Sequence, residues 1–334
     1  MVESNGVELT EQEAELYDRQ IRLWGLDSQK RIRAARVLIA GLNGLGAEIA
    51  KNTILAGVKS VTLLDDRKVT EEDFCSQFLA PQSALGSNRA EASLTRAQNL
   101  NPMVELKVDT DALATKPDEF FKEFDIVCII GAPTAEYVRV NNVCREGNVK
   151  FFACDVWGMY GTFFVDLQEH EFVEDVYKHK VIAKATKQQK EKTEMVCIPC
   201  KRLFKYPAYQ ALVDYDFSAP ANARTLKQNS VALPLVRLLQ KFRDDEQRDP
   251  AYGKREEDLK KLLELRDAVA PGMIPDSAFG NVFAQIAPIT AIVGGAVAHE
   301  IIKVVSQKEV PHKNLVLFDP EQCTATVVEV GCEN

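Results

Sequence analysis

The stretch RVLIAGLNGLGAEIAKNTILAGVKSVTLLD, at residues 36–65, decides the fold of this 334-residue chain. Its first residues are apolar and end at Gly41, which predicts a short buried strand. A helix is expected at 46–56, with Gly57 as its left-handed C-terminal stop. Residues 60–65 read as a second strand. A strand, a glycine loop, a helix and a strand within about 30 residues make one βαβ crossover unit.

Outward from this unit, strand-like and helix-like patterns alternate. Further strands are predicted at 104–109, 125–131, 150–154, 161–167 and 314–319, and helices at 11–35 (interrupted near Gly25), 88–99, 136–146 and 288–305. Strands alternating with helices favour an α/β fold with a doubly wound, mainly parallel, Rossmann-like sheet.

Residues 168–276 interrupt this alternation. The segment 168–194 is polar and rich in lysine, and we expect it to be an exposed loop. Amphipathic helices are expected further on, at 231–242 and 256–268. The chain is therefore predicted to hold one sheet domain, residues 10–167 plus 277–334, with 168–276 as an inserted region of mixed helix and loop.

Composition excludes several classes of protein. A net charge of -8 makes the nucleic-acid backbone a poor partner. The longest uncharged apolar run, Ala284 to Ala298, is shorter than the ~20 residues of a membrane span, so no membrane partner is expected. No basic and then apolar leader is visible at the start, so the cysteines are expected to be reduced thiols in cytosol or nucleus.

The glycine loop is the candidate cofactor-binding site. Gly41, Gly44 and Gly46 would let a phosphate approach the backbone, and the following helix supplies amides. Asp65 ends the second strand, where a ribose-binding acid would lie. However, Asn43 replaces a glycine of the usual pattern, and its Cβ would crowd a pyrophosphate. Two interpretations stay open: a nucleotide site, or glycines that only permit tight packing of strand against helix.

The cysteines point to neither a metal nor a thioester. Cys197 and Cys200 form a single CxxC pair, whereas a structural zinc site needs four ligands. None of the eight cysteines lies in a context that predicts a lowered pKa. We therefore expect no metal site and no thioester-forming cysteine. His299 is interpreted as a core or interface residue.

Several motifs together resemble the family that adenylates ubiquitin-like proteins, which includes bacterial sulfur-carrier adenylating enzymes and eukaryotic activating enzymes. These motifs are YDRQIRLWG at 17–25, VLIAGLNGLG at 37–46, QFL at 77–79, APITAIVGG at 287–295 and EIIK at 300–303. Within the family, the segments at 20–58, 87–93 and 97–102 are similar to the smaller, non-thioester subunits of SUMO-activating heterodimers.

Departures from the family pattern indicate a disabled site. Active halves carry Asn-x-Asn-Arg-Gln-Phe where this chain has DFCSQF at 73–78, and a lysine where it has Arg89. They also carry an aspartate that holds Mg²⁺ where this chain reads GAPT at 131–134. Without that carboxylate the metal has no anchor. The resemblance thus implies that this chain adenylates nothing by itself.

The resemblance implies a role in trans for Arg19. In this family the arginine of the Tyr-Asp-Arg-Gln stretch contacts the ATP phosphates of the partner, and a guanidinium suits phosphate oxygens. Without the resemblance, Arg19 would be interpreted as a surface residue or a helix partner of Glu15. The implied partner is the larger, thioester-bearing subunit, which holds ATP, Mg²⁺ and the SUMO C-terminus.

SUMO and the SUMO-conjugating enzyme are further expected partners. The resemblance implies location in the nucleus, and also in the cytoplasm, and the lysines from Lys178 to Lys192 agree weakly with this. Three alternatives remain open. They are an autonomous sulfur-carrier-type adenylyltransferase, an NAD-dependent dehydrogenase using the loop and Asp65, and a structural scaffold.

Overall fold

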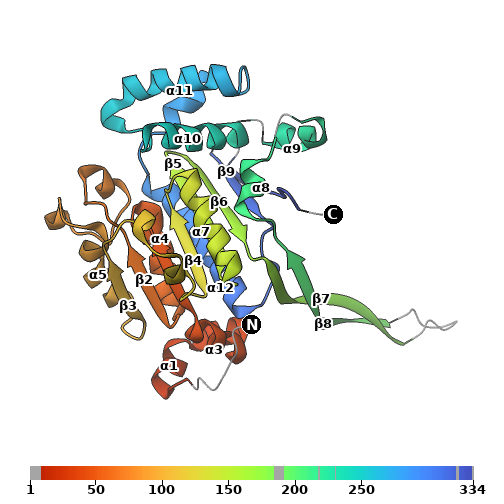
Figure 1. Cartoon of the computed structure of the whole chain (residues 1–334). Helices are drawn as coiled ribbons and strands as arrows, with labels where there is room; N and C mark the ends of the chain where they lie inside the picture. The colour runs from red at the N-terminus through yellow and green to blue at the C-terminus, as the bar shows by residue number, and fades with distance from the viewer. Residues whose placement is uncertain (1–8, 184–191, 217–218, 230, 321–322, 333–334) are drawn as a thin grey trace.

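The computed structural model describes residues 9–183, 192–216, 219–229, 231–320 and 323–332. One eight-stranded sheet forms its centre, in the order β10-β9-β6-β5-β4-β1-β2-β3 (Figure 1). The parallel strands are β1 (Arg36–Ala40), β2 (Ser60–Leu64), β3 (Glu105–Asp109), β4 (Ile126–Ile130) and β5 (Lys150–Trp157). The antiparallel additions are β6 (Tyr160–Asp166), β9 (Leu315–Asp319) and β10 (Thr324–Val328). The predicted mainly parallel sheet is confirmed.

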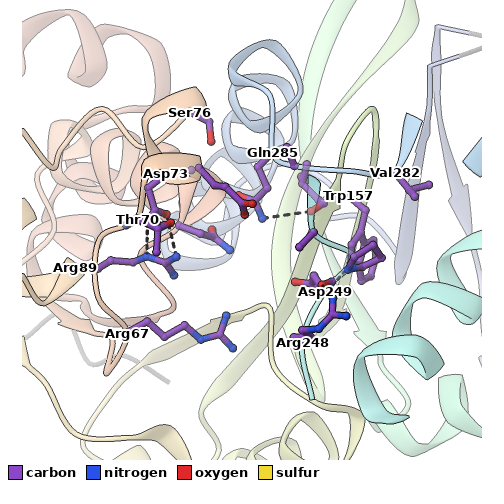
Figure 2. Close-up of a pocket in the computed structure, with 17 residues that line it drawn as sticks. Arg67, Thr70, Asp73, Ser76, Arg89, Trp157, Arg248, Asp249, Val282 and Gln285 are labelled. Carbon is purple, nitrogen blue, oxygen red and sulfur yellow. Dashed lines mark hydrogen bonds and ion pairs between the residues drawn. The ribbon is translucent and has the colours of Figure 1, made fainter. Parts of the chain in front are cut away.

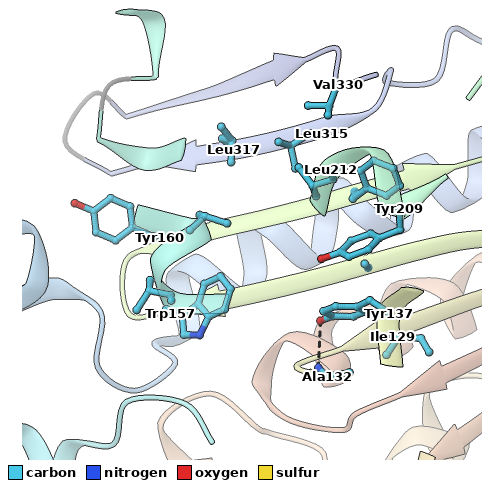
Figure 3. Packing of buried hydrophobic residues seen from close by; sticks show 14 of the residues in the cluster. Ile129, Ala132, Tyr137, Trp157, Tyr160, Tyr209, Leu212, Leu315, Leu317 and Val330 are labelled. Carbon is cyan, nitrogen blue, oxygen red and sulfur yellow. Dashed lines mark hydrogen bonds between the residues drawn. The ribbon is translucent and has the colours of Figure 1, made fainter. Parts of the chain in front are cut away.

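Helices cover both faces of this sheet, which is the doubly wound arrangement. One buried cluster joins the sheet to α3 (Leu26–Ala34), α4 (Gly44–Ala56), α5 (Arg89–Leu100) and α12 (Ala287–Ser306). The other joins it to α6 (Asp118–Phe121), α7 (Thr134–Glu146), α8 (Tyr209–Val213), α10 (Ala232–Glu246) and α11 (Arg255–Val269) (Figure 3). Strand β4 and residues 37–40 of β1 are uniformly apolar because both of their faces are buried.

The inserted region shares the core of the sheet. Leu235 of α10 and Leu262 of α11 belong to the same buried cluster as Val127 of β4 and Phe151 of β5. Both helices were predicted from their apolar periodicity. The region therefore closes one face of the sheet, and the domain boundaries at 168 and 276 stay a prediction.

The prediction of an exposed loop at 168–194 was wrong. Residues Glu169–Ala183 form β7 and Lys192–Lys205 form β8, and together they make an antiparallel ribbon that projects from the body (Figure 1). Pairs such as Val176 with Ile198 hold its register. Both faces of most of the ribbon meet solvent, so the usual alternation of apolar and polar residues is weak. The central lysines of the run lie outside the described residues.

The N-terminal arm consists of α1 (Glu11–Leu16) and α2 (Asp18–Trp24), with the predicted interruption at Gly25 (φ 89°). The predicted stop at Gly57 is also confirmed, since its φ and ψ are 82° and 43°. The remaining helix is α9 (Ala223–Gln228), and short 3-10 turns lie at Glu71–Cys75, Gln82–Ala84, Leu113–Thr115, Pro220–Asn222, Tyr252–Lys254 and Asp276–Asn281.

The sequence predicted no segment long and apolar enough to span a membrane. By length and composition alone, α12 does not agree with this prediction. The helix has 20 residues and is apolar enough to span a bilayer, but 67% of the apolar window is buried inside the protein. It packs on α4, α3 and β6. Its apolar composition is therefore that of a core helix.

Candidate functional site

Two adjoining cavities lie at the carboxyl edge of the parallel strands, where ligands bind in open α/β sheets. One has a volume of about 400 Å³ and lies over Gly41, between the ends of β1, β2 and β4. The other, of about 250 Å³, lies between residues 70–76 and Trp157 (Figure 2). Asn43, Arg67 and Arg89 line both. The sequence-predicted loop thus lies at a cavity.

The glycines of the loop are required by close packing. Gly41 has a φ of 102°, and a Cβ there would lie 2.4 Å from the Ile130 carbonyl oxygen. A Cβ on Gly46 would lie 1.9 Å from the carbonyl oxygen of Gly41. The Asn43 side chain accepts a hydrogen bond from the amide of Gly46 at 3.1 Å. This cap occupies an amide that would otherwise face a phosphate, so the packing interpretation explains the motif.

Both oxygens of the Asp65 carboxylate accept hydrogen bonds from backbone amides. One oxygen accepts the amide of Leu42 at 2.6 Å and the other accepts the amide of Arg67 at 2.8 Å. Burial raises the pKa of this carboxyl, while nearby Arg89 opposes the shift. A ribose hydroxyl would have to compete with these internal hydrogen bonds. The predicted ribose-binding acid therefore fastens the glycine loop to β2.

An acid occupies the side of the site where phosphate would bind. Asp73 receives a two-pronged contact from Arg89, through Nε at 3.0 Å and Nη2 at 3.0 Å (Figure 2). Both side chains are largely buried. The sequence pointed to a missing amide and arginine here. The structure adds that Asp73 neutralises Arg89, so the charge of this arginine is not free to meet a phosphate.

The turn that would carry a magnesium ligand is filled by protein groups. The amides of Gly131 and Ala132 donate to the Tyr137 hydroxyl at 3.0 and 3.2 Å, and this hydroxyl donates to Asp155 at 3.1 Å. Arg243 donates to the Ala132 carbonyl at 3.1 Å. Within the described ranges, no group of three or more His, Cys, Asp or Glu could hold a metal ion. The turn at 131–134 therefore offers no carboxylate to a magnesium ion.

Sequence reasoning missed Arg243, which lies at the centre of a buried network. Its guanidinium donates to Asp155 at 2.6 Å and to Asp249 at 2.7 Å, and lies 4.8 Å from the ring centroid of Trp157. The Trp157 indole donates to the same Asp249 oxygen. Burial raises the pKa of Asp155 to about 6, although Arg243 opposes this. No local motif signals the network, because it joins β5 to the inserted helix α10.

Arg19 lies outside both cavities. It is exposed on α2, and the described part of the chain gives it no hydrogen bond or ion pair. The helix itself is anchored by Tyr17, which is 1% exposed, lies against Gly57 and accepts a hydrogen bond from Asn101 at 2.8 Å. The arm therefore holds Arg19 on the surface, free to meet another molecule.

The cysteines have no shared metal geometry. Cys197 and Cys200 are three residues apart on β8, so their side chains lie on opposite faces of the ribbon. Burial raises the pKa of Cys144 and of Cys154. The pKa of Cys197 is also raised, first by desolvation. None of these shifts favours a thiolate.

Comparisons with known proteins agree with the fold and motifs. The ThiF family model matches residues 17–333. SUMO-activating enzyme subunit 1 of Homo sapiens is 44% identical, covering 95% of each chain, and that of Xenopus laevis is 43% identical, covering 99% of each. That of Danio rerio is 43% identical.

Solved structures give a likeness of fold alone. A crystal structure of PaaA has a TM-score of 0.58 at 13% identity, covering 97% of this chain and 85% of PaaA. A crystal structure of E. coli MccB with succinimide has a TM-score of 0.56 at 11% identity, covering 99% of this chain and 74% of MccB. By its family match and its full-length relatives, this chain belongs to the ThiF family.

Proposed function

We propose that this chain is the non-catalytic subunit of a SUMO-activating heterodimer. The partner subunit would bind ATP and Mg²⁺, adenylate the SUMO C-terminus and carry the thioester cysteine. This chain would dock against that subunit and lend Arg19 to the ATP phosphates. The isolated chain would be inactive.

The observation that carries this proposal is the pairing of Asp73 with Arg89 inside the site. The Asp73 carboxylate consumes the positive charge of Arg89, so this arginine is not free to pair with the phosphates of ATP. The turn at 131–134 adds no carboxylate for a metal. These features disfavour an autonomous adenylyltransferase. The hydrogen bonds that occupy Asp65 disfavour a dehydrogenase, and the full-length relatives favour SUMO as the modifier.

Exposed apolar side chains on the face formed by α2 and the α4–α12 pair support a subunit interface. Leu23 is 74% exposed, Ile292 on α12 is 51% exposed, and Leu55 at the end of α4 is 42% exposed. The Gln20 side chain donates to the Leu55 carbonyl at 3.2 Å, so α2 lies beside this end of α4. Arg19 precedes Gln20, at the margin of this face. A partner docked here would come within reach of Arg19.

We further propose that SUMO and the SUMO-conjugating enzyme contact the assembled heterodimer, and that the protein works in the nucleus and also in the cytoplasm. The acidic balance of the chain supports the absence of a nucleic-acid partner. The burial of α12 supports the absence of a membrane partner.

Subunit omission tests the proposal. The chain is co-purified with a thioester-bearing SUMO-activating subunit, and SUMO-dependent ATP–pyrophosphate exchange is measured with both subunits and with each alone. We expect exchange only with both. Exchange by this chain alone at a rate comparable with the pair would refute the proposal, as would failure of the two chains to co-purify.

A further inference from the structure

The last turn of α4 is where helix α2 of the N-terminal arm is fastened to the body of the protein. A helix leaves its final carbonyl oxygens without partners inside the helix. Here three successive carbonyls accept side-chain amides: Ile54 from Asn101 at 3.0 Å, Leu55 from Gln20 at 3.2 Å and Ala56 from Gln29 at 3.2 Å. Each of these three amides either belongs to α2 or contacts a residue at one of its ends.

The first contact holds the start of α2. The side-chain amide of Asn101 is buried, and it also donates to the Tyr17 hydroxyl at 2.8 Å. The ring of Tyr17 lies against Gly57, where an added Cβ would be 2.4 Å from a ring carbon. Gly57 therefore makes room for this ring as well as ending α4.

The other two contacts hold the middle and the end of α2. Gln20 belongs to the helix, so its hydrogen bond to the Leu55 carbonyl joins α2 directly to α4. At the end of the helix, Trp24 Nε1 donates to Oε1 of Gln29 at 3.0 Å, and Gln29 in turn donates to α4. Gln29 is fully buried, and breaking the hydrogen bonds of a buried amide carries its full desolvation cost.

Hydrogen bonds, and not apolar burial, decide where α2 lies. None of the residues Asp18–Trp24 is buried, so the helix gains little from apolar packing. Arg19 lies between the first two fastened points, since Tyr17 precedes it by two residues and Gln20 follows it directly. The backbone of Arg19 is thus held in place, although its exposed side chain has no hydrogen bond or ion pair within the described chain.

We propose that Tyr17, Gln29 and Asn101 are positioning residues, which set the direction in which α2 presents Arg19 to the ATP phosphates of the partner subunit. This inference rests on the proposed function of Arg19. A guanidinium that meets phosphate oxygens in a transition state must be held near the productive geometry, because a displacement of about 1 Å can cost about 10²-fold in rate. The hydrogen bonds to α4 provide this hold before the subunits meet.

The double variant Tyr17→Phe/Gln29→Met removes two of the three fastenings and keeps Arg19. In the assembled heterodimer, at saturating ATP and saturating partner subunit, it should lower the turnover number of SUMO-dependent ATP–pyrophosphate exchange by about tenfold. The matched control is Tyr209→Phe/Gln240→Met, which removes a hydroxyl–amide hydrogen bond of 3.2 Å at the other buried cluster and should exchange like the parent. If the double variant folds poorly, Tyr17→Phe alone should still lower the turnover number by about fivefold, the worth of one hydrogen bond.

The same substitutions in an Arg19→Ala background separate positioning from a structural role. Because they act through Arg19, they should cause no further loss of exchange there. Equal losses with and without Arg19 would overturn the inference and leave the proposed function standing, as would parental exchange by the anchor variants when Arg19→Ala alone loses exchange. Parental exchange by Arg19→Ala itself would refute the proposed role of Arg19, and this inference with it.

Hydrogen exchange of the isolated chain gives a readout that needs no partner subunit. The backbone amides of residues 18–25 should exchange about tenfold faster in Tyr17→Phe/Gln29→Met than in the parent, because local opening of α2 becomes easier. The control Tyr209→Phe/Gln240→Met should keep the parental rate for these amides. Unchanged protection in the anchor variant would show that these hydrogen bonds do not hold α2, and would overturn the inference.

Discussion

At the scale of single residues, a few charged side chains decide which groups near the glycine loop are free to bind a phosphate. Arg89 still lies beside the glycine loop, but its charge is spent on Asp73. Asp65 keeps its position and holds the loop. Arg19, by contrast, is exposed and unengaged within the described chain. A guanidinium available to another molecule thus remains on the arm, while in the pocket Arg67 lines both cavities without a side-chain ion pair among the described residues.

Substitution Arg19→Ala should lower SUMO adenylation by the assembled heterodimer by roughly 10²–10³-fold, the scale for loss of one preorganised transition-state donor. The rate is measured by ATP–pyrophosphate exchange at saturating ATP. The control is Arg22→Ala on the same helix, whose side chain pairs with Asp18 in solvent. The two variants should form the heterodimer equally well, and only Arg19→Ala should lose exchange. If Arg19→Ala kept an exchange rate close to that of the parent, the role of Arg19 would be refuted and the chain would act only as a structural scaffold.

His170 should make the isolated chain less stable in mild acid. Burial and the nearby Lys150 charge lower the pKa of His170 to about 4, whereas the unfolded chain has a value of about 6.5. The unfolded state therefore binds more protons between these values. The contribution is present above pH 6.5 and is lost as pH falls toward 4. By linkage it amounts to about 2 kcal/mol between pH 7 and pH 5.

The measurement is urea unfolding at both pH values in buffer without phosphate. His170→Gln should lose less stability between pH 7 and pH 5 than the parent, by about 2 kcal/mol. His299→Gln, at an exposed site, should behave like the parent. Parallel pH profiles for His170→Gln and the parent would contradict the assignment.

At the scale of elements, α12 packs extensively on α4, and the two adjacent glycines of α12 have different roles. A Cβ on Gly294 would lie 2.5 Å from the Cβ of Glu48 on α4. A Cβ on Gly295 would meet nothing within 4 Å. The first glycine therefore permits the approach of the helices, and the second leaves an open surface on the proposed interface face.

Gly294→Ala should lower the free energy of unfolding by about 1–3 kcal/mol, because the clash involves atoms near the backbone that cannot swing away. Gly295→Ala is the matched control and should raise stability by about 0.5–1 kcal/mol through helix propensity. Urea unfolding of the isolated chain measures both. Equal effects of the two substitutions would contradict the packing assigned to Gly294.

At the scale of the whole molecule, the inserted region is joined to the sheet by charge as well as by apolar packing. Arg243 of α10 pairs with Asp155 of β5, and both side chains are 4% exposed or less. The two residues are 88 positions apart in the chain. Arg243 also donates to the Ala132 carbonyl in the turn after β4. One side chain thus fixes the inserted helix and holds a turn that lines the cavity over Gly41.

Arg243→Met should destabilise the chain by about 3–5 kcal/mol, because it leaves the buried Asp155 without its counter-charge. Lys241→Met removes an exposed charge from the same helix and should change stability by less than about 1 kcal/mol. Unfolding in urea, followed by tryptophan fluorescence and circular dichroism, compares them. A loss in Arg243→Met no larger than in Lys241→Met would show that apolar packing alone holds the inserted region.

The sequence by itself determined the βαβ unit around residues 36–65, the stop at Gly57 and most strands of the sheet. Such features depend on neighbours a few residues apart, through apolar periodicity and glycine conformation. The same patterns located Asp65 and the glycine loop at the carboxyl edge. The resemblance to the adenylating family, also carried by the sequence, implied which groups are missing at 73–78 and 131–134.

Only the tertiary structure decided what stands in place of the missing groups. Asp73 neutralises Arg89, and Arg243 reaches the turn after β4 from a helix far along the chain. The ribbon of β7 and β8 likewise depends on pairing between two strands whose own alternation is weak. In each case the contact free energy comes from residues brought together by folding, and no local propensity records such a contact.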